Sequence, residues 1–150
     1  MLHLLDAVES LETLERVQEG PLLKLRSRWV GSANDAPAVF RPLLKAEYRT
    51  WLDRGQWDES KWTTEWELEV PMLPGGVTAR GRNTFEEVDE ETTIWRVNGE
   101  FTVHPDQMPP ILSPIARAGQ GALERFVVGI VEANMRNSVK IALRWLDENE

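Results

Sequence analysis

The C-terminal run over residues 120–146 constrains the fold most, because its pattern fits one long element. Apolar side chains recur in it every three or four residues, as they do along one face of an α-helix. Those on the predicted apolar face are Leu123, Phe126, Val127, Ile130, Ile141 and Trp145, and those opposite are Arg125, Glu132, Arg136 and Lys140. We therefore expect one amphipathic helix about 40 Å long, which would cross a domain of this size.

Two polar side chains, Asn134 and Ser138, project onto the apolar face of this predicted helix. A buried amide or hydroxyl needs a hydrogen-bond partner. A facing strand or a buried water would supply one if the helix packs in a closed core. A bound ligand would supply one if the helix lines a cavity. The pattern by itself leaves both alternatives open.

A second apolar stripe runs along the same helix, turned by about 120° from the first. It consists of Val128, Met135, Val139 and Leu146. A helix that buries one side against a sheet does not need this stripe, and a row of exposed apolar side chains is unusual for a monomer. We therefore predict a homodimer that buries it.

Upstream of the helix, apolar and polar residues alternate in successive short runs, as they do in half-buried strands. The alternation predicts consecutive antiparallel strands over residues 61–70, 77–88 and 92–103. Earlier strands are expected over residues 22–30 and 44–52, with a loop over 31–43 and a turn at 53–55, while residues 10–17 fit a strand or a helix. Short turns between the runs favour an antiparallel meander with one apolar face, on which the helix would lie.

Length and composition limit the class of protein. A chain of 150 residues that is 41% hydrophobic predicts a single domain over residues 1–150 with a sizeable core. The net charge of −8 and the dispersed basic residues argue against nucleic-acid binding. The sequence contains no cysteine and no apolar run long enough for a membrane span, so we expect a cytoplasmic protein.

Motifs for catalysis or for metal and cofactor binding are not found. His3 and His104 lack neighbouring ligands at a metal-binding spacing, so no metal site and no cofactor are predicted. The acidic residues 86–91 indicate a solvated hairpin tip rather than a calcium loop. The strand faces assigned as inward carry no carboxylate and no histidine, so no catalytic residue is assigned and the sequence favours a protein that is not an enzyme.

The inward faces instead carry many aromatic side chains, and the chain has seven tryptophans. These residues, with a few polar ones among them, form either a packed core or the wall of a ligand pocket. The candidate ligand-binding residues on the strands are Ser27, Trp29, Trp62, Trp66, Asn83, Trp95 and Phe101, and those on the helix are Phe126, Ile130, Asn134 and Ser138.

Three segments carry a resemblance to the START-like (SRPBCC) superfamily of helix-grip proteins, which includes polyketide cyclases, lipid-transfer domains and pathogenesis-related allergens. They are the strand region GVTARGRNTFEEVDEETTIWRVNGEFTV, the proline-rich connection DQMPPILSPIARAG and the helix GALERFVVGIVEANM. The resemblance implies an α+β fold in which a curved antiparallel β-sheet grips a long C-terminal α-helix. Family members normally begin with a strand and two short helices, so the N-terminus of this chain looks shortened.

The same resemblance implies a function. It suggests binding or transport of a hydrophobic small molecule, such as a lipid or a polyketide-like compound, in a pocket between the sheet and the C-terminal helix. The alternatives are an enzyme of the polyketide cyclase or aromatase type and an interaction module that binds no ligand. An enzyme would need an acid or base turned into the pocket, for which Asp53, Glu100 and His104 are the candidates.

Overall fold

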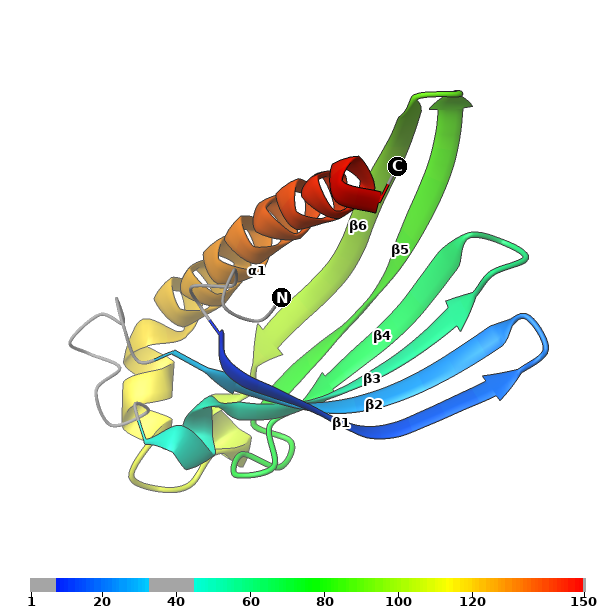
Figure 1. Ribbon diagram of the computed structural model, residues 1–150. Coiled ribbons are helices and arrows are strands. Elements are labelled where there is room, and N and C mark those ends of the chain that lie inside the picture. The colour runs from blue at the N-terminus through cyan, green and yellow to red at the C-terminus, as the bar shows by residue number, and fades with distance from the viewer. Residues whose placement is uncertain (1–7, 33–44, 150) are drawn as a thin grey trace.

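The computed structural model of the protein describes residues 8–32 and 45–149, which form one antiparallel sheet and one long helix (Figure 1). The strands are β1 (Val8–Glu19), β2 (Leu22–Gly31), β3 (Thr50–Asp58), β4 (Thr63–Glu69), β5 (Val77–Asp89) and β6 (Thr92–Val103). The helices are the 3-10 turns η3 (Ala46–Arg49) and η4 (Pro105–Gln107) and the α-helix α1 (Ser113–Asn149). The strands pair in sequence order, each antiparallel to the next, so the predicted meander is confirmed.

The later strands match the sequence pattern closely, because their alternation is strong and their turns are short. β4, β5 and β6 lie within a residue or two of the predicted ranges. Residues 8–19 form a strand rather than a helix, and Gly20 supplies the positive φ of 59° in the turn that joins it to β2. The β5–β6 hairpin projects past the tips of the other hairpins (Figure 1).

β3 differs from the prediction. The expected strand over residues 44–52 and turn at 53–55 are wrong, because β3 begins at Thr50, continues through those three residues and ends at Asp58. The Asp-Arg-Gly sequence has the composition of a turn. However, Asp53 pairs with Ser27 of β2 and with Leu68 of β4, so hydrogen bonding on both sides keeps the segment extended. The loop predicted over residues 31–43 lies largely outside the described residues.

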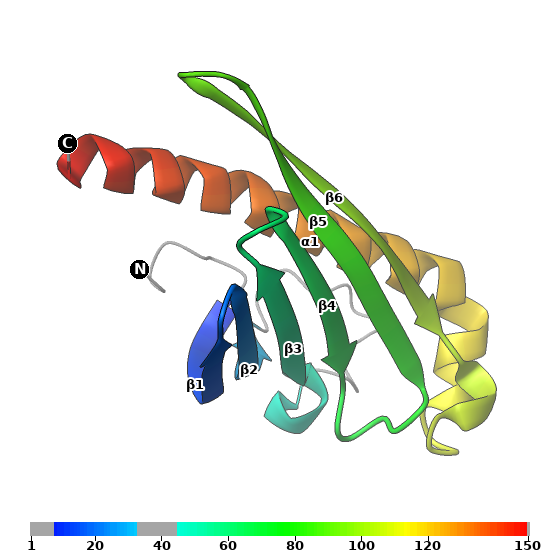
Figure 2. The same cartoon turned by 90° about the vertical axis from the view of Figure 1, so that its right-hand side faces the viewer.

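The predicted helix-grip fold is wrong. The protein is mainly a six-stranded antiparallel sheet, and the sheet does not grip the helix. Among the strands, α1 contacts mainly the edge strand β6, and its other principal contact is with η4. Figure 2 shows α1 crossing β6 at an angle, with its C-terminal half extending beyond that strand. Within the described residues, no helix combines the length and the apolar character that crossing a membrane requires.

The position of the buried core explains this arrangement. Its described members lie at one end of the sheet, where the β4–β5 turn, the end of β6, η4 and the start of α1 meet. They are Leu73, Val103, Met108, Leu112 and Ala116. Among the described side chains, those of α1 that join this core lie at the N-terminal end of the helix. The sequence pattern predicted that the helix begins at residue 120. The core residues Leu112 and Ala116 lie before that position, so the predicted helix did not include them.

Two side chains of α1 satisfy the exposed edge of β6. The amide Nε2 of Gln120 donates to the carbonyl oxygen of Val103 at 2.9 Å. The backbone N–H of Val103 donates to Oε1 of Glu124 at 3.0 Å, and Gln120 also donates to that oxygen at 3.3 Å. The two residues are one helical turn apart, so they face the same stretch of strand. They cap the last residue of an edge strand that would otherwise offer unpaired backbone groups.

We predict that Glu124→Ala lowers the free energy of unfolding by about 1–2 kcal/mol, because the backbone N–H of Val103 loses its acceptor. Val103 is only 1% exposed, so water cannot replace that acceptor. Urea unfolding followed by circular dichroism measures the change. Arg125→Ala is the matched control, because Arg125 is exposed on the same helical turn and its loss should have a much smaller effect. Equal destabilisation by the two variants would contradict the capping role of Glu124.

Candidate ligand-binding face

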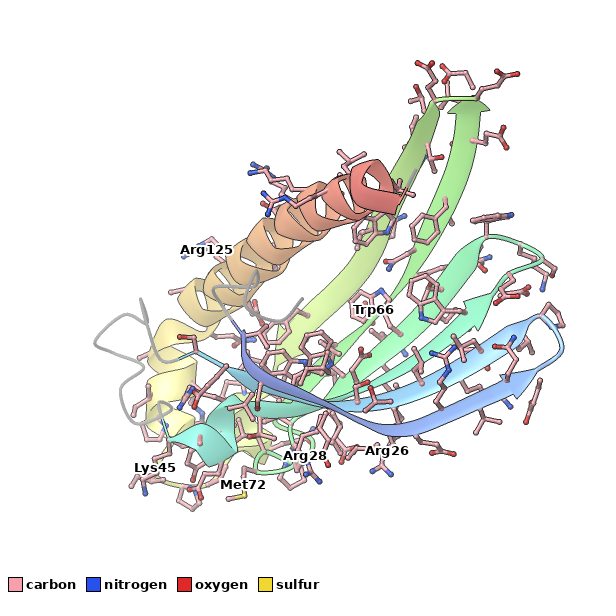
Figure 3. The ribbon with its side chains drawn as sticks, viewed as in Figure 1. Arg26, Arg28, Lys45, Trp66, Met72 and Arg125 are labelled. Carbon is pink, nitrogen blue, oxygen red and sulfur yellow. The ribbon has the colours of Figure 1, made fainter. Side chains whose placement is uncertain are left out.

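The register divides the side chains of the sheet between two faces. One row across the strands, on what we call the inner face, contains Ser27, Asp53, Leu68, Ala79 and Phe101. The neighbouring row, on the outer face, contains Arg26, Arg54, Glu67, Arg80 and Glu100. Figure 3 shows Trp66 on the side of the sheet where α1 lies and Arg26 and Arg28 on the other side. The inner face therefore carries most of the aromatic residues, with charged exceptions such as Asp53 and Arg16, and the outer face carries most of the charges.

Trp66 lies at the centre of the inner face, over a row of glycines. It pairs with Gly81 of β5, which pairs in turn with Gly99 of β6. A Cβ atom at Gly99 would come within 2.7 Å of Cζ2 and Cη2 of the Trp66 ring. The glycines therefore leave the space in which the indole lies against the sheet. The indole Nε1 donates to Oδ1 of the buried Asn83 at 3.1 Å, which fixes the orientation of the ring.

Stacked aromatic rings flank this centre on both sides. Trp29 of β2 and Trp51 of β3 stack with centroids 6.1 Å apart and planes 2° from parallel. Towards the hairpin tips, Phe85 stacks between Trp57 at 6.0 Å and Trp95 at 5.7 Å. These rings are at most partly buried, so the inner face presents flat apolar surface.

Polar atoms without partners lie among the rings. Four buried atoms on this face have no hydrogen-bond partner among the described residues, namely Nε1 of Trp29, Oδ1 of Asp53, Oγ1 of Thr64 and Nε1 of Trp95. Burial raises the pKa of Asp53, and the neighbouring Trp29 side chain offsets only part of that rise. An unsatisfied buried polar group costs about 1–3 kcal/mol, so a ligand that offers donors and acceptors would gain from these atoms.

The structure brings most of the predicted strand residues together. Those on the inner face are Ser27, Trp29, Trp66, Asn83, Trp95 and Phe101. Trp62 does not join them, because it lies in the β3–β4 turn with a φ of 52° and is 69% exposed. Its alternation with Trp66 had suggested an inward position, but β4 begins one residue later. The side chains of Phe126, Ile130, Asn134 and Ser138 lie outside what the structure describes.

The predicted ligand-binding residues did not include Trp51, Asp53 and Trp57, which lie on the inner face. Asp53 and Trp57 were omitted because the predicted strand ended at residue 52, although Asp53 was named as a candidate acid or base, and Trp51 was within that strand but was not assigned to the inward face. The expectation that the inward faces carry no carboxylate is therefore wrong, since Asp53 lies in the middle of the inner face. Glu100 points to the outer face and accepts a hydrogen bond from Nε of Arg80 at 2.7 Å. His104 contacts Oγ1 of the exposed Thr78 at 3.0 Å. Neither of these two residues joins Asp53.

A hollow bordered by described residues lies on the outer face. It is an open groove of about 1130 Å³ that crosses all six strands. The side chains that line it include Lys24, Arg26, Arg54, Glu65, Glu67, Arg80, Arg82 and Glu100. Leu25, Trp66 and three glycines also border the groove, but the many charged side chains around them make it less suited to an apolar ligand than the inner face. Across residues 8–32 and 45–149, no three His, Asp or Glu side chains lie close enough to hold a metal ion.

Comparison of the sequence with models of known protein families and with curated proteins found no match. The resemblance to the START-like superfamily therefore stays a prediction. The candidate site is defined by the geometry of the inner face, which does not depend on that resemblance.

We predict that Gly99→Ala lowers the free energy of unfolding by about 1–3 kcal/mol, because the new methyl group would overlap the Trp66 ring. Gly129→Ala in α1 is the control, since an added Cβ there meets no atom of another part of the chain within 4 Å. It should raise the free energy of unfolding by about 0.5–1 kcal/mol, because alanine has a higher helix propensity than glycine. Thermal unfolding followed by tryptophan emission measures both. Tolerance of Gly99→Ala with unchanged emission would mean that the ring does not lie over the glycine row.

Proposed function

We propose that the protein binds a hydrophobic small molecule, such as a lipid or a polyketide-like compound, on the inner face of the sheet. One observation carries the proposal: partly exposed aromatic rings surround buried polar atoms that lack partners. Pockets for small ligands combine these features, because apolar walls supply affinity and a few polar atoms supply orientation. The two stacks and Trp66 provide the walls, and Asp53, Thr64 and the two indole N–H groups provide the polar atoms.

Energetics favour a ligand over a closed core. Burial of apolar ligand surface contributes about 25 cal/mol per Å², so a few hundred Å² would give micromolar binding after the cost of association. A closed core would leave the four unpartnered atoms as a net loss. In addition, the described apolar core lies at one end of the sheet, away from the aromatic rings near the hairpin tips.

Asp53 favours a second candidate, an enzyme of the polyketide cyclase or aromatase type. Such an enzyme needs a positioned acid or base beside its substrate, and Asp53 is a carboxylate on the aromatic face with a raised pKa. Turnover of an aromatic polyketide-like substrate, lost in Asp53→Asn, would support the enzyme. Binding without turnover would support the carrier.

The binding proposal predicts that fatty acids, sterols or aromatic polyketide-like compounds change the tryptophan emission saturably. Trp66→Leu should weaken binding of the responding compound at least tenfold, because it removes the central wall of the face. Trp62→Leu is the matched control, because Trp62 is exposed in a turn, and it should leave the affinity unchanged. If no compound class alters the emission, the ligand proposal fails and the alternative of an interaction module without a ligand is favoured.

We also propose that the protein forms a homodimer through the second stripe of α1. Val128, Val139 and Leu146 are 44%, 42% and 50% exposed, and exposed apolar side chains on one helix favour self-association. The Met135 side chain, the fourth member, lies outside the described part of the helix.

For this dimer we expect sedimentation at twice the chain mass of 17.2 kDa at micromolar concentration. Val139→Glu should convert it to a monomer, because a charge would enter the apolar interface, while Lys140→Glu on the neighbouring exposed position should not. A wild-type monomer at that concentration would reject the dimer. A cytoplasmic location also stays a prediction, which fractionation of cells that express the chain would test.

A further inference from the structure

Asp53 is the one ionisable member of the inner-face row. It lies in the third strand, opposite Ser27 on one side and Leu68 on the other. Along its own strand, the residues that share its face are Trp51 and Gly55. Its Oδ1 is buried and has no hydrogen-bond partner among the described residues. The strand neighbours that share its face among the described residues are therefore neutral.

The basic residue next to it in sequence does not compensate this charge. Arg54 points to the outer face, where its Nη2 donates to Oε2 of Glu69 at 2.9 Å. A carboxylate buried without a cation is unfavourable, and proteins usually pair such a group or keep it at the surface. The described part of the chain thus supplies neither of the usual solutions at Asp53.

Trp29 and Ser27 are the nearby donors on the described strands, and both are neutral, so neither compensates the charge of an ionised Asp53. The indole Nε1 of Trp29 forms no hydrogen bond of ordinary geometry with the described residues, but it lies close enough to Asp53 to lower the pKa of that carboxyl. Even if the ring turned to donate to Asp53, it would supply one hydrogen to a group with two acceptor oxygens. It would also leave the negative charge uncompensated. Trp29 therefore orients Asp53 at most, and the carboxylate keeps the capacity to bind a second donor.

We propose that Asp53 makes the inner face selective for a ligand that carries a protonated amine on an apolar or aromatic body. This inference rests on the proposed function, and it narrows the ligand class. An ammonium group would neutralise the buried charge and form a charge-assisted hydrogen bond. The stacked rings of Trp29 and Trp51 lie beside Asp53 and offer faces to which a cation is attracted. A neutral hydroxyl would supply only the hydrogen bond.

Three probes with the same body test the proposal. They are 4-phenylbutylamine, 4-phenylbutanol and 4-phenylbutyrate, which differ only in the terminal group. Isothermal titration at neutral pH compares their affinities for the wild-type protein, for Asp53→Asn and for Asp58→Asn. Asp58 is the matched control, because it lies on the same strand but pairs with Lys61 at the hairpin turn. We expect the wild type to prefer the amine over the alcohol by about tenfold and to bind the butyrate most weakly.

The variants separate the selectivity from the binding itself. In Asp53→Asn the preference for the amine should fall to about equal affinity, while the alcohol still binds, whereas Asp58→Asn should keep the wild-type preference. If the wild type binds the amine and the alcohol with equal affinity, the proposed role of Asp53 is overturned and the binding proposal stays intact. An amine preference that persists in Asp53→Asn would have the same meaning. Failure of all three probes to bind would overturn both.

The stability of the variant supplies an independent readout. Asp53→Asn removes an uncompensated buried charge, so its melting temperature at neutral pH should equal or exceed that of the wild type. A marked fall in melting temperature would mean that the carboxylate is paired within the folded chain, and this result would also overturn the proposal. If the variant does not fold, the wild-type preference among the three probes decides the proposal, because that measurement needs no variant.

Discussion

The pairing of β3 with its two neighbours decides what each face of the sheet carries. Side chains alternate strictly along a strand, so a shift of one residue would move Asp53 to the outer face and Arg54 to the inner face. The observed register places Ser27, Asp53 and Leu68 in one row and keeps Arg26, Arg54 and Glu67 in the next. The separation of rings from charges across six strands depends on this central strand.

The glycine row has a second structural effect. Gly81 and Gly99 remove two side chains from the middle of the inner face, and the Trp66 indole occupies that space. The sheet is therefore covered there by a ring from one of its own strands. The described core is confined to the end of the sheet where α1 begins. This arrangement leaves partly exposed aromatic surface beside the described core.

The sequence predicted those features that depend on local periodicity. The alternation over β4, β5 and β6 and the helical repeat of α1 are strong, and both were located without a structure. The features that depend on long-range pairing were missed. The composition of Asp53, Arg54 and Gly55 indicates a turn, and only pairing on both sides keeps them in β3. The capping of Val103 by Gln120 and Glu124 joins residues distant in sequence, so no local pattern could reveal it. The expected grip of the sheet on the helix came from a resemblance and not from these periodicities.

Two aspartates on the same strand show how position determines the cost of a charge. Asp58 accepts hydrogen bonds from Ser60 and Lys61 at the hairpin turn, which lowers its pKa to about 2. Its ionised form therefore favours folding above its ordinary pKa of 3.8, and this contribution is lost as the pH falls towards 2. Asp53 has the opposite effect on stability. Burial raises its pKa, so its ionisation disfavours folding as the pH rises above 3.8. Asparagine or leucine at this position would avoid that cost. A carboxylate that opposes folding, placed beside the stacked indoles of Trp29 and Trp51 on the face proposed to bind ligand, has its simplest physical explanation in the charge of what it binds.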